Sequence, residues 1–328
     1  MLEYTREKIR QILWDANHRL AIFPKDSKNR ILVIQEEGLG NAILTTPLIQ
    51  ALATLDPPKS IDALVNRARG TDLVFENWSL INKVWDRTEL ASRTELLYCH
   101  TVLECHPRHE LPSNVKYQRR LRISIRIQSG LDYHWHFAKH ESEYLLDLAR
   151  QLGYIGARPP LRRPPGASNY DFSFSDNMIA IGIGYAKTLR ADGRDWRDRH
   201  WGTENFLELC LKLKSLGFRP ILVGDQKDFD RDGVPLAQQG VESVCGKLSL
   251  AQIIDFIGRC RAFIGNDTGL MHVAATTGVP TIGIFVNTNS VKSYPLGNQC
   301  IALGGNHGPK TYKIKPQQVL SSLNSFIG

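Results

Sequence analysis

The stretch AFIGNDTGLMHVAATTGVPTIGIF, residues 262–285, decides the fold of this 328-residue chain. An apolar run ends at Gly265, a polar turn leads to Gly269, and a helical pattern over Gly269–Thr277 starts at once. A second apolar run, Pro280–Phe285, follows that helix. Strand, helix and strand in this order are typical of a parallel sheet, so the stretch predicts an α/β fold.

The same alternation runs through both halves of the chain. We expect strands at residues 31–35, 61–65, 80–85, 96–103, 178–183 and 220–223, and helices at 41–54, 141–152, 203–215 and 249–258. Four prolines in the nine residues Arg158–Gly166 exclude a helix or a central strand there. This segment predicts a linker between a domain over 31–160 and a domain over 167–328, preceded by an amphipathic extension over 1–30.

The composition indicates a globular protein with anionic partners. Hydrophobic residues make up 42% and charged residues 23%, and no apolar run is long enough to cross a bilayer. Six scattered cysteines are typical of a reduced compartment, so we expect a cytoplasmic protein. The net charge of +8 favours nucleotides, phosphorylated glycolipids, membrane surfaces or nucleic acids without choosing among them.

The turn Gly265–Gly269 has the features of a phosphate-binding site. Glycines let the backbone approach a ligand closely, and the amides at a helix N-terminus favour an anion. Thr268 adds a hydroxyl, and His272 lies one turn further on the same helix face. In the alternative interpretation, Asp267 only caps the helix and His272 is a core histidine with satisfied hydrogen bonds.

A second strand-to-helix turn, EEGLGN at residues 36–41, carries two carboxylates. Gly38 and Gly40 predict a bend, and Asn41 is expected to cap the following helix. Ile43 breaks the dinucleotide fingerprint Gly-x-Gly-x-x-Gly, which argues against a nicotinamide cofactor. The turn is then either a plain connection or a loop that places a carboxylate near an acceptor.

A basic segment and a group of potential metal ligands fall late in the first half. Lys116–Arg126 holds five basic residues and no acid, which fits either a solvated helix or edge face, or a patch for a phosphorylated acceptor or an anionic membrane. Because no nucleic-acid-binding module accompanies it, we expect no nucleic-acid partner. Spacings that match no zinc pattern predict no metal site among Cys99, His100, Cys105, His106, His109, His134, His136 and His140. His106 or His109 would instead line the acceptor side.

Three segments give the chain a family resemblance. ILVIQEEGLGNAILTTPLIQAL (31–52), RHWGTENFLELCLKLKSLGFRPILVGDQKD (199–228) and LSLAQIIDFIGRCRAFIGNDTGLMHVAATTGVPTIGIF (248–285) resemble glycosyltransferase family 9, which contains the ADP-heptose:lipopolysaccharide heptosyltransferases. The resemblance implies a GT-B architecture, in which two Rossmann-like domains face a central cleft and the C-terminal domain binds the donor. It also implies an inverting transfer of heptose from an ADP-sugar to a hydroxyl, without a metal or other cofactor.

The resemblance also assigns residues to the donor. Asp267, Thr268, Gly269 and His272 stand where the family binds the diphosphate and the sugar. Arg199 replaces a usual lysine that contacts the diphosphate, and Asp228 replaces a glutamate that often contacts the ribose. The loop 184–201 adds positive charge, of which Lys187 is expected to meet the phosphates, with Thr188 as a hydroxyl donor.

The catalytic base is the main departure from the family. Where the family has an aspartate this chain has Asn41, and an amide cannot accept a proton at neutral pH. In one alternative, Glu37, or else Glu36, acts as the base in place of the aspartate. In a second, stabilisation of the leaving group suffices for catalysis. In a third, the chain is an inactive sugar-nucleotide-binding relative. A GT-B enzyme acting on another nucleotide-sugar is a further alternative. The expected acceptor is lipopolysaccharide core, a protein or a small molecule, met in the cytoplasm or at the inner membrane.

Overall fold

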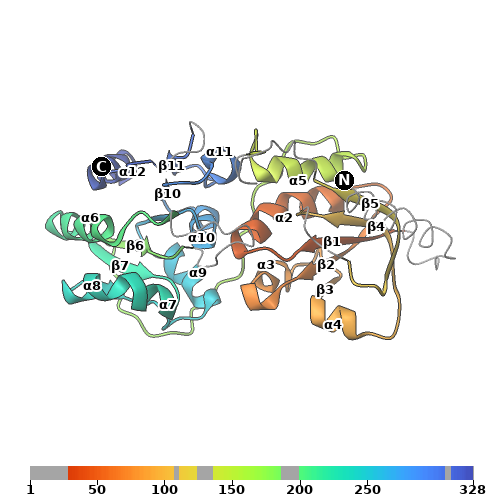
Figure 1. The fold of residues 1–328 in the computed structure, drawn as a ribbon, viewed down its shortest axis with the longest axis horizontal. Coiled ribbons are helices and arrows are strands. Elements are labelled where there is room, and N and C mark those ends of the chain that lie inside the picture. Colours follow the sequence, from red (N-terminus) through yellow and green to blue (C-terminus); the bar gives the residue numbers. More distant parts are fainter. Residues whose placement is uncertain (1–28, 107–110, 124–135, 186–198, 307–311, 328) are drawn as a thin grey trace, which may run out of the picture. The chain divides into compact units, whose positions relative to one another are not determined.

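The computed structural model describes residues 29–106, 111–123, 136–185, 199–306 and 312–327 (Figure 1). The chain forms two compact units. The first holds the described residues of Met1–Gly38, Thr45–Ser124 and Tyr144–Pro160, and the second holds those of Leu39–Leu44, Ile125–Glu143 and Leu161–Gly328. Each unit is built on a parallel sheet, which confirms the predicted α/β class. The expected extension over 1–30 lies outside the described residues, apart from its last two positions.

The first unit has a five-stranded sheet with β1 at its centre. Its order is β3-β2-β1-β4-β5, and every neighbouring pair is parallel. The strands are β1 (Arg30–Gln35), β2 (Ser60–Val65), β3 (Lys83–Asp86), β4 (Leu97–Glu104) and β5 (Val115–Arg122). The apolar run of β1 is fully buried because strands and helices surround a central parallel strand.

The helices of the N-terminal half lie between these strands or, in the case of α5, after the last of them. They are α2 (Leu39–Ala53), α3 (Asp72–Phe75), α4 (Arg87–Ser92) and α5 (Glu141–Arg150), with a short 3₁₀ helix η2 (Arg67–Arg69). Residues 158–166 form neither helix nor strand, as the prolines require. None of the helices in the described residues combines the length and the apolar composition needed to cross a bilayer.

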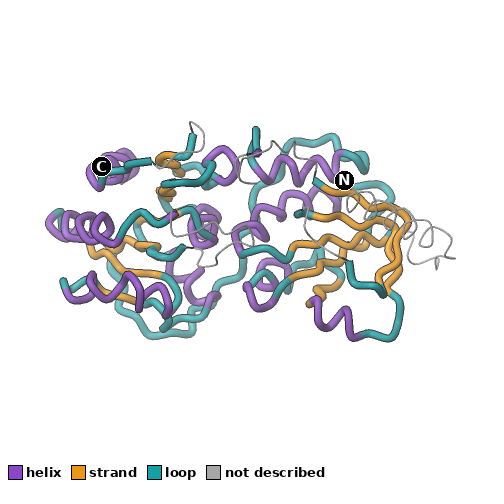
Figure 2. The backbone as a smooth tube through the Cα atoms, in the orientation of Figure 1, coloured by secondary structure: helices purple, strands orange, loops and turns teal. Residues whose placement is uncertain are grey.

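The second unit has a six-stranded sheet in the order β11-β10-β9-β6-β7-β8, also parallel throughout. Figure 2 shows the strands in orange and the helices in purple. Its strands are β6 (Met178–Gly182), β7 (Arg219–Val223), β8 (Glu242–Ser243), β9 (Ala262–Asn266), β10 (Thr281–Phe285) and β11 (Cys300–Gly304). Its helices are α6 (Thr203–Ser215), α7 (Gln226–Asp228), α8 (Val234–Gln238), α9 (Leu250–Gly258), α10 (Gly269–Thr277), α11 (Ser290–Ser293) and α12 (Pro316–Ile327), with a π-helical turn η5 (Phe229–Gly233).

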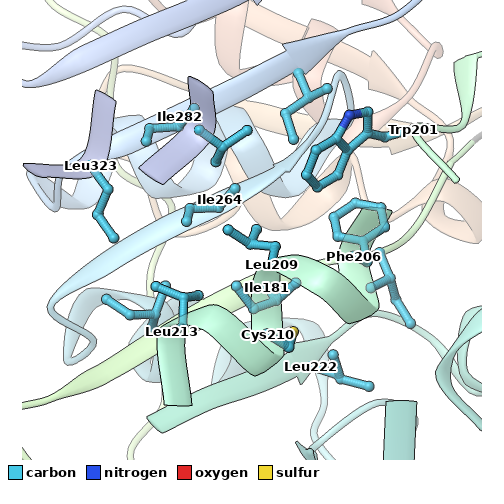
Figure 3. Packing of buried hydrophobic residues seen from close by; sticks show 14 of the residues in the cluster. Ile181, Trp201, Phe206, Leu209, Cys210, Leu213, Leu222, Ile264, Ile282 and Leu323 are labelled. Carbon is cyan, nitrogen blue, oxygen red and sulfur yellow. The ribbon is translucent and has the colours of Figure 1, made fainter. Parts of the chain in front are cut away.

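One side of this second sheet is covered by α6 and α12 (Figure 3). Leu209 and Leu213 of α6 and Leu323 of α12 pack on isoleucines of β6, β9 and β10. Trp201 meets Phe206 edge to face, with ring centroids 4.9 Å apart, and its indole N–H donates to the Ile314 carbonyl oxygen at 2.7 Å. This packing holds the segment that precedes α6 against the sheet, close to the carboxyl end of β9.

Most of the predicted elements are confirmed, and three predictions are wrong. Asn41 does not cap a helix: α2 begins at Leu39 with Gly38 as N-cap, so Asn41 lies within the first turn. The strand expected from residue 80 begins only at Lys83, because Trp78 and Ile81 form a hydrogen-bonded turn. The list of expected strands lacks β5; the basic segment there is an edge strand, in line with the solvated-edge alternative.

Candidate functional site

The donor turn, Gly265–Gly269, is anchored by a buried amide at the end of β9. The Asn266 side chain is completely buried, and its Oδ1 accepts from the Trp201 backbone N–H at 3.2 Å. Its Nδ2 donates to the carbonyl oxygens of Ile183 at 3.3 Å and Gly184 at 3.1 Å. These three bonds fix the turn to the segments that follow β6 and precede α6.

Beyond Asn266 the chain opens onto the N-terminus of α10. The N-cap is Thr268 in an extended conformation, and within the described residues no side-chain hydrogen bond caps this helix. The interpretation that Asp267 caps α10 is therefore wrong. Its backbone N–H donates to the Ile284 carbonyl oxygen at 3.1 Å, and its Oδ1 accepts from Ser293 Oγ at 3.3 Å. The first turn of α10 thus lacks a side-chain cap from any described residue, while the Met271 N–H donates to the Thr268 carbonyl oxygen at 3.2 Å.

His272 is a buried imidazole in the first turn and a half of α10. Burial, and then the nearby charge of Lys292, lower its pKa to about 3, so the ring is neutral at physiological pH. Among the described residues its Nδ1 has no hydrogen-bond partner although it is shielded from solvent. Buried polar atoms are rarely left unpaired in a native protein. His272 is therefore a core histidine, but its hydrogen bonding is not satisfied within the described residues.

Gly40 and Gly269 bring the first turns of α2 and α10 together within the second unit, to which Leu39–Leu44 belongs. A Cβ atom on Gly40 would lie 2.7 Å from Cδ2 of His272 and 3.4 Å from Cα of Gly269. A Cβ on Gly269 would lie 3.1 Å from Cβ of Leu39. Glycine is required at residue 40 because a side chain there would overlap the buried imidazole.

Asn41 lies next to a buried ion pair that the sequence did not reveal. Asn41 Nδ2 donates to Glu141 Oε1 at 3.0 Å, and Lys292 Nζ donates to Glu141 Oε2 at 2.6 Å. The Glu141 and Lys292 side chains are only 1% and 7% exposed. In the sequence Glu141 is an ordinary acidic residue at a helix start, and Lys292 falls in a polar segment without a motif. Their pairing depends on tertiary contacts alone.

The remaining predicted donor residues differ in how much the structure says of them. Lys187 and Thr188 lie outside the described residues. Arg199 is half-buried and stands two residues before Trp201. Asp228 Oδ2 accepts from the Asp225 N–H at 3.1 Å, and its Oδ1 accepts from Arg231 at 3.0 Å. Asp228 thus lies shortly after β7 with both oxygens already hydrogen-bonded.

The carboxylates after β1, in the first unit, are paired with cations. Glu36 is held by Arg87, whose Nε and Nη2 atoms donate at 2.6 and 2.5 Å. Glu37 lies 3.4 Å from Arg69 and 3.6 Å from His106 Nδ1. Glu37 is a third exposed and Glu36 only a tenth, so Glu37 remains the better candidate for a base.

Two arginines of the basic segment on β5 share one acidic partner. Glu104 of β4 is completely buried and accepts from both Arg120 and Arg122. The segment itself holds no acid, and this carboxylate comes from the neighbouring strand. Arg126 lies outside the described residues.

The cysteines and histidines that invited a metal hypothesis are dispersed. Burial raises the pKa of the Cys99 thiol to about 12, and His140 bonds Ser142 Oγ at 2.8 Å and the Tyr294 carbonyl oxygen at 3.1 Å. No group of three or more potential metal ligands occurs in the part of the chain that the structure describes. His109 and His134 lie outside that part.

Known proteins resemble this chain in sequence and in fold. The model of "Glycosyltransferase family 9 (heptosyltransferase)" matches residues 184–323. Lipopolysaccharide heptosyltransferase 2 of Escherichia coli K12 is 26% identical over 193 residues, 52% of this chain and 53% of that protein. This chain thus spans about half the length of the curated relatives it matches.

Solved structures extend the likeness in fold to nearly the whole chain. A family 9 glycosyltransferase from Veillonella parvula superposes with a TM-score of 0.70 at 18% identity, covering 93% of this chain and 99% of that one. The E. coli ADP-heptose lipopolysaccharide heptosyltransferase II gives 0.64 at 21% identity, covering 91% and 98%. The predicted GT-B fold class is confirmed. Residues 184–323 of this chain are thus similar to glycosyltransferase family 9, and the fold likeness to solved members of that family extends over nearly the whole chain.

Proposed function

We propose that this protein is an inverting glycosyltransferase that binds an ADP-sugar, with ADP-heptose as the first candidate, on the donor turn. One observation carries the proposal: the uncapped N-terminus of α10 adjoins a buried His272 Nδ1 that has no partner among the described residues. An uncapped helix N-terminus favours a phosphate, and a neutral imidazole can hydrogen-bond a phosphate or a sugar hydroxyl. The name of the similar E. coli enzyme, which includes ADP-heptose, supports this choice of donor.

The donor residues share the work of stabilising a leaving diphosphate. The amides that start at Gly269 and the Thr268 hydroxyl are proposed to face the charge that develops as the diphosphate departs. Arg199, Lys187 and Thr188 are proposed to add cationic and hydroxyl donors, and Asp228 to meet the ribose. The resemblance implies that no metal takes part in this transfer.

Deprotonation of the acceptor hydroxyl falls to Glu37 in this proposal. A base must be ionised and reachable, and Glu37 is the more exposed of the two carboxylates that follow β1. Asn41 serves as a hydrogen-bonding residue rather than a base. The proposed acceptor is a hydroxyl of a phosphorylated glycolipid such as lipopolysaccharide core, supported by the name of the E. coli relative. A protein or small-molecule acceptor, and contact with an anionic membrane, remain alternatives.

Ligand-dependent melting tests the donor assignment. ADP and ADP-heptose should raise the melting temperature more than matched GDP- and UDP-sugars, because a ligand that binds only the folded state stabilises it. Asp267→Ala should abolish donor turnover while shifting the melting temperature by less than about 3 °C, since it removes one hydroxyl contact.

Asp176→Ala, at an exposed aspartate before β6, is the matched control and should keep full turnover. Turnover by Asp267→Ala at the wild-type rate would refute the donor assignment. Binding of ADP-sugars without transfer to any acceptor would favour the sugar-nucleotide-binding alternative. No shift with any nucleotide would count against every enzymatic interpretation.

A further inference from the structure

Glu141 joins two segments that flank the donor turn. It is the first residue of α5, and its two carboxylate oxygens go to different partners: Oε1 to Asn41 and Oε2 to Lys292. All three residues belong to the second unit. Because a buried carboxylate is costly without compensating charge, the 2.6 Å contact with Lys292 is what allows Glu141 to be almost completely buried.

The hydrogen bond from Asn41 fixes the orientation of its amide. Both carboxylate oxygens of Glu141 accept, one from Lys292 and one from Asn41, so the NH₂ group of Asn41 must face Glu141 and its Oδ1 must face away. Reversing the amide would set an oxygen lone pair against a carboxylate. The carboxylate therefore selects one of the two orientations that an asparagine can adopt.

Both partners of Glu141 adjoin the donor turn. Asn41 follows Gly40, which contacts the His272 ring. Lys292 is close enough for its charge to lower the pKa of His272, and the next residue, Ser293, donates to Asp267. A displacement of Glu141 would thus be felt at the turn from both sides.

We propose that Glu141 is a positioning residue of this site, which orients the Asn41 amide and holds the Lys292 ammonium beside the donor turn. The inference rests on the proposed donor site, and it adds a residue that lies far from every sequence motif. Glu141 acts through its two partners, because its own side chain is buried. Its three-residue chain, Asn41–Glu141–Lys292, carries one negative and one positive charge and is neutral overall.

The hydrogen-bond directions predict which substitutions the group Asn41–Glu141–Lys292 tolerates. Asn41→Asp alone would place two carboxylates about 3 Å apart, with the Lys292 ammonium bonded to the other oxygen of Glu141, which is strongly unfavourable. Asn41→Asp with Glu141→Gln moves the negative charge instead of adding one. The NH₂ group of the substituted glutamine would then donate to the new carboxylate, while its carbonyl oxygen would accept from Lys292.

A double-mutant cycle tests the proposal with three readouts: melting temperature, ADP affinity and the kcat and KM of donor turnover. Asn41→Asp and Glu141→Gln should each lower kcat by about tenfold or more and should each lower the melting temperature by about 5 °C. The double variant should recover to within about threefold of the wild-type kcat and about 2 °C of its melting temperature. Recovery of this kind separates positioning from a general structural defect, because the second substitution must repair the first.

Two controls match these changes in kind. Asp147→Asn removes a carboxylate from the same helix, where it forms a half-exposed pair with Arg150, and should change all three readouts little. Lys212→Met removes the lysine of a surface pair with Glu208, as a match for Lys292→Met. Lys292→Met should weaken ADP binding and lower the melting temperature. Adding Glu141→Gln to Lys292→Met should restore part of the lost melting temperature, because no unpaired carboxylate then remains.

The outcomes separate this inference from the proposed function. Additive losses in the double variant, or an Asn41→Asp protein as active and stable as wild type, would overturn the positioning role even if ADP binds. If wild type binds no ADP-sugar, the proposed function fails. The melting cycle alone then decides whether the three residues are coupled, and the absence of an ADP effect contradicts a role at a donor site.

Discussion

The two strand-to-helix turns of this chain look alike in sequence and differ in their partners. The turn after β1 and the turn after β9 both end a buried strand with a buried amide, Gln35 and Asn266, and both start a helix without a side-chain cap among the described residues. After β1 the carboxylates are balanced by arginines and a histidine. After β9 the carboxylate of Asp267 accepts from a hydroxyl, and His272 has a nitrogen without a partner among the described residues. The difference teaches that hydrogen-bond and charge partners, more than glycine spacing, distinguish the turn that we propose to bind a ligand from the turn that is already paired.

The largest expected effect breaks the anchor of the donor turn. Asn266→Leu leaves a Trp201 N–H and two carbonyl oxygens without their buried partner, and should lower the free energy of unfolding by about 3–5 kcal/mol. Gln35→Leu, the equivalent change after β1, should cost about 1–2 kcal/mol. Among the described residues, Gln35 makes two side-chain hydrogen bonds, to Thr45 Oγ1 and from the Glu37 N–H, which is fewer than the three of Asn266. Urea unfolding of both variants measures the contrast, and equal losses would contradict it.

A smaller effect follows from the depressed pKa of His272. The unfolded chain takes up this proton near pH 6.5, whereas the folded protein takes it up only near pH 3. The stabilisation is complete above pH 6.5 and is lost as the pH falls toward 3. Between pH 7 and pH 5 the free energy of unfolding should drop by about 2 kcal/mol from this residue. His272→Gln should lose that part of the slope in urea titrations at several pH values; an unchanged slope would show that the imidazole is not buried neutral.

The smallest stability effect sharpens the contrast between capped and uncapped helices. Ser249 caps α9 in a reciprocal capping box with Gln252, so Ser249→Ala should cost about 1 kcal/mol. Thr268→Ala, at the start of α10, should cost less than about 0.5 kcal/mol because its hydroxyl does not cap the helix. Calorimetric titration should nevertheless show weaker ADP binding by Thr268→Ala and unchanged binding by Ser249→Ala. Unchanged binding by both would remove Thr268 from the donor site.

Local signals in the sequence are sufficient for most of the fold. They predict the helices Thr203–Ser215 and Gly269–Thr277 to the residue, and Ser249 as a cap, because apolar period, capping residues and glycines agree at those places. They miss the edge strand β5 because its charges pair with Glu104 on another strand, which no local pattern encodes. They start α2 two residues too late for the same kind of reason, since Gly40 packs against His272, far along the chain.

The residues of the candidate site also divide into those that local sequence patterns predict and those that only tertiary contacts bring together. The donor turn is predictable from a strand, two glycines and a helix start, whereas Glu141 and Lys292 come together only in the folded second unit. This pairing also changes what Asn41 means. The residue is not simply a base that was lost, because its amide has a carboxylate partner that an aspartate would repel.

The contact between Gly40 and Gly269 has a consequence for attempts to redesign the enzyme. A methyl group at residue 40 would overlap the His272 ring, whereas one at residue 269 would press on Leu39 Cβ, so each substitution would push the starts of α2 and α10 apart. Either change alone is thus enough to disturb this contact, although the two residues lie far apart in the chain. Libraries that probe the proposed donor site are therefore better varied at Asp228 or Arg199, with residues 40 and 269 kept constant.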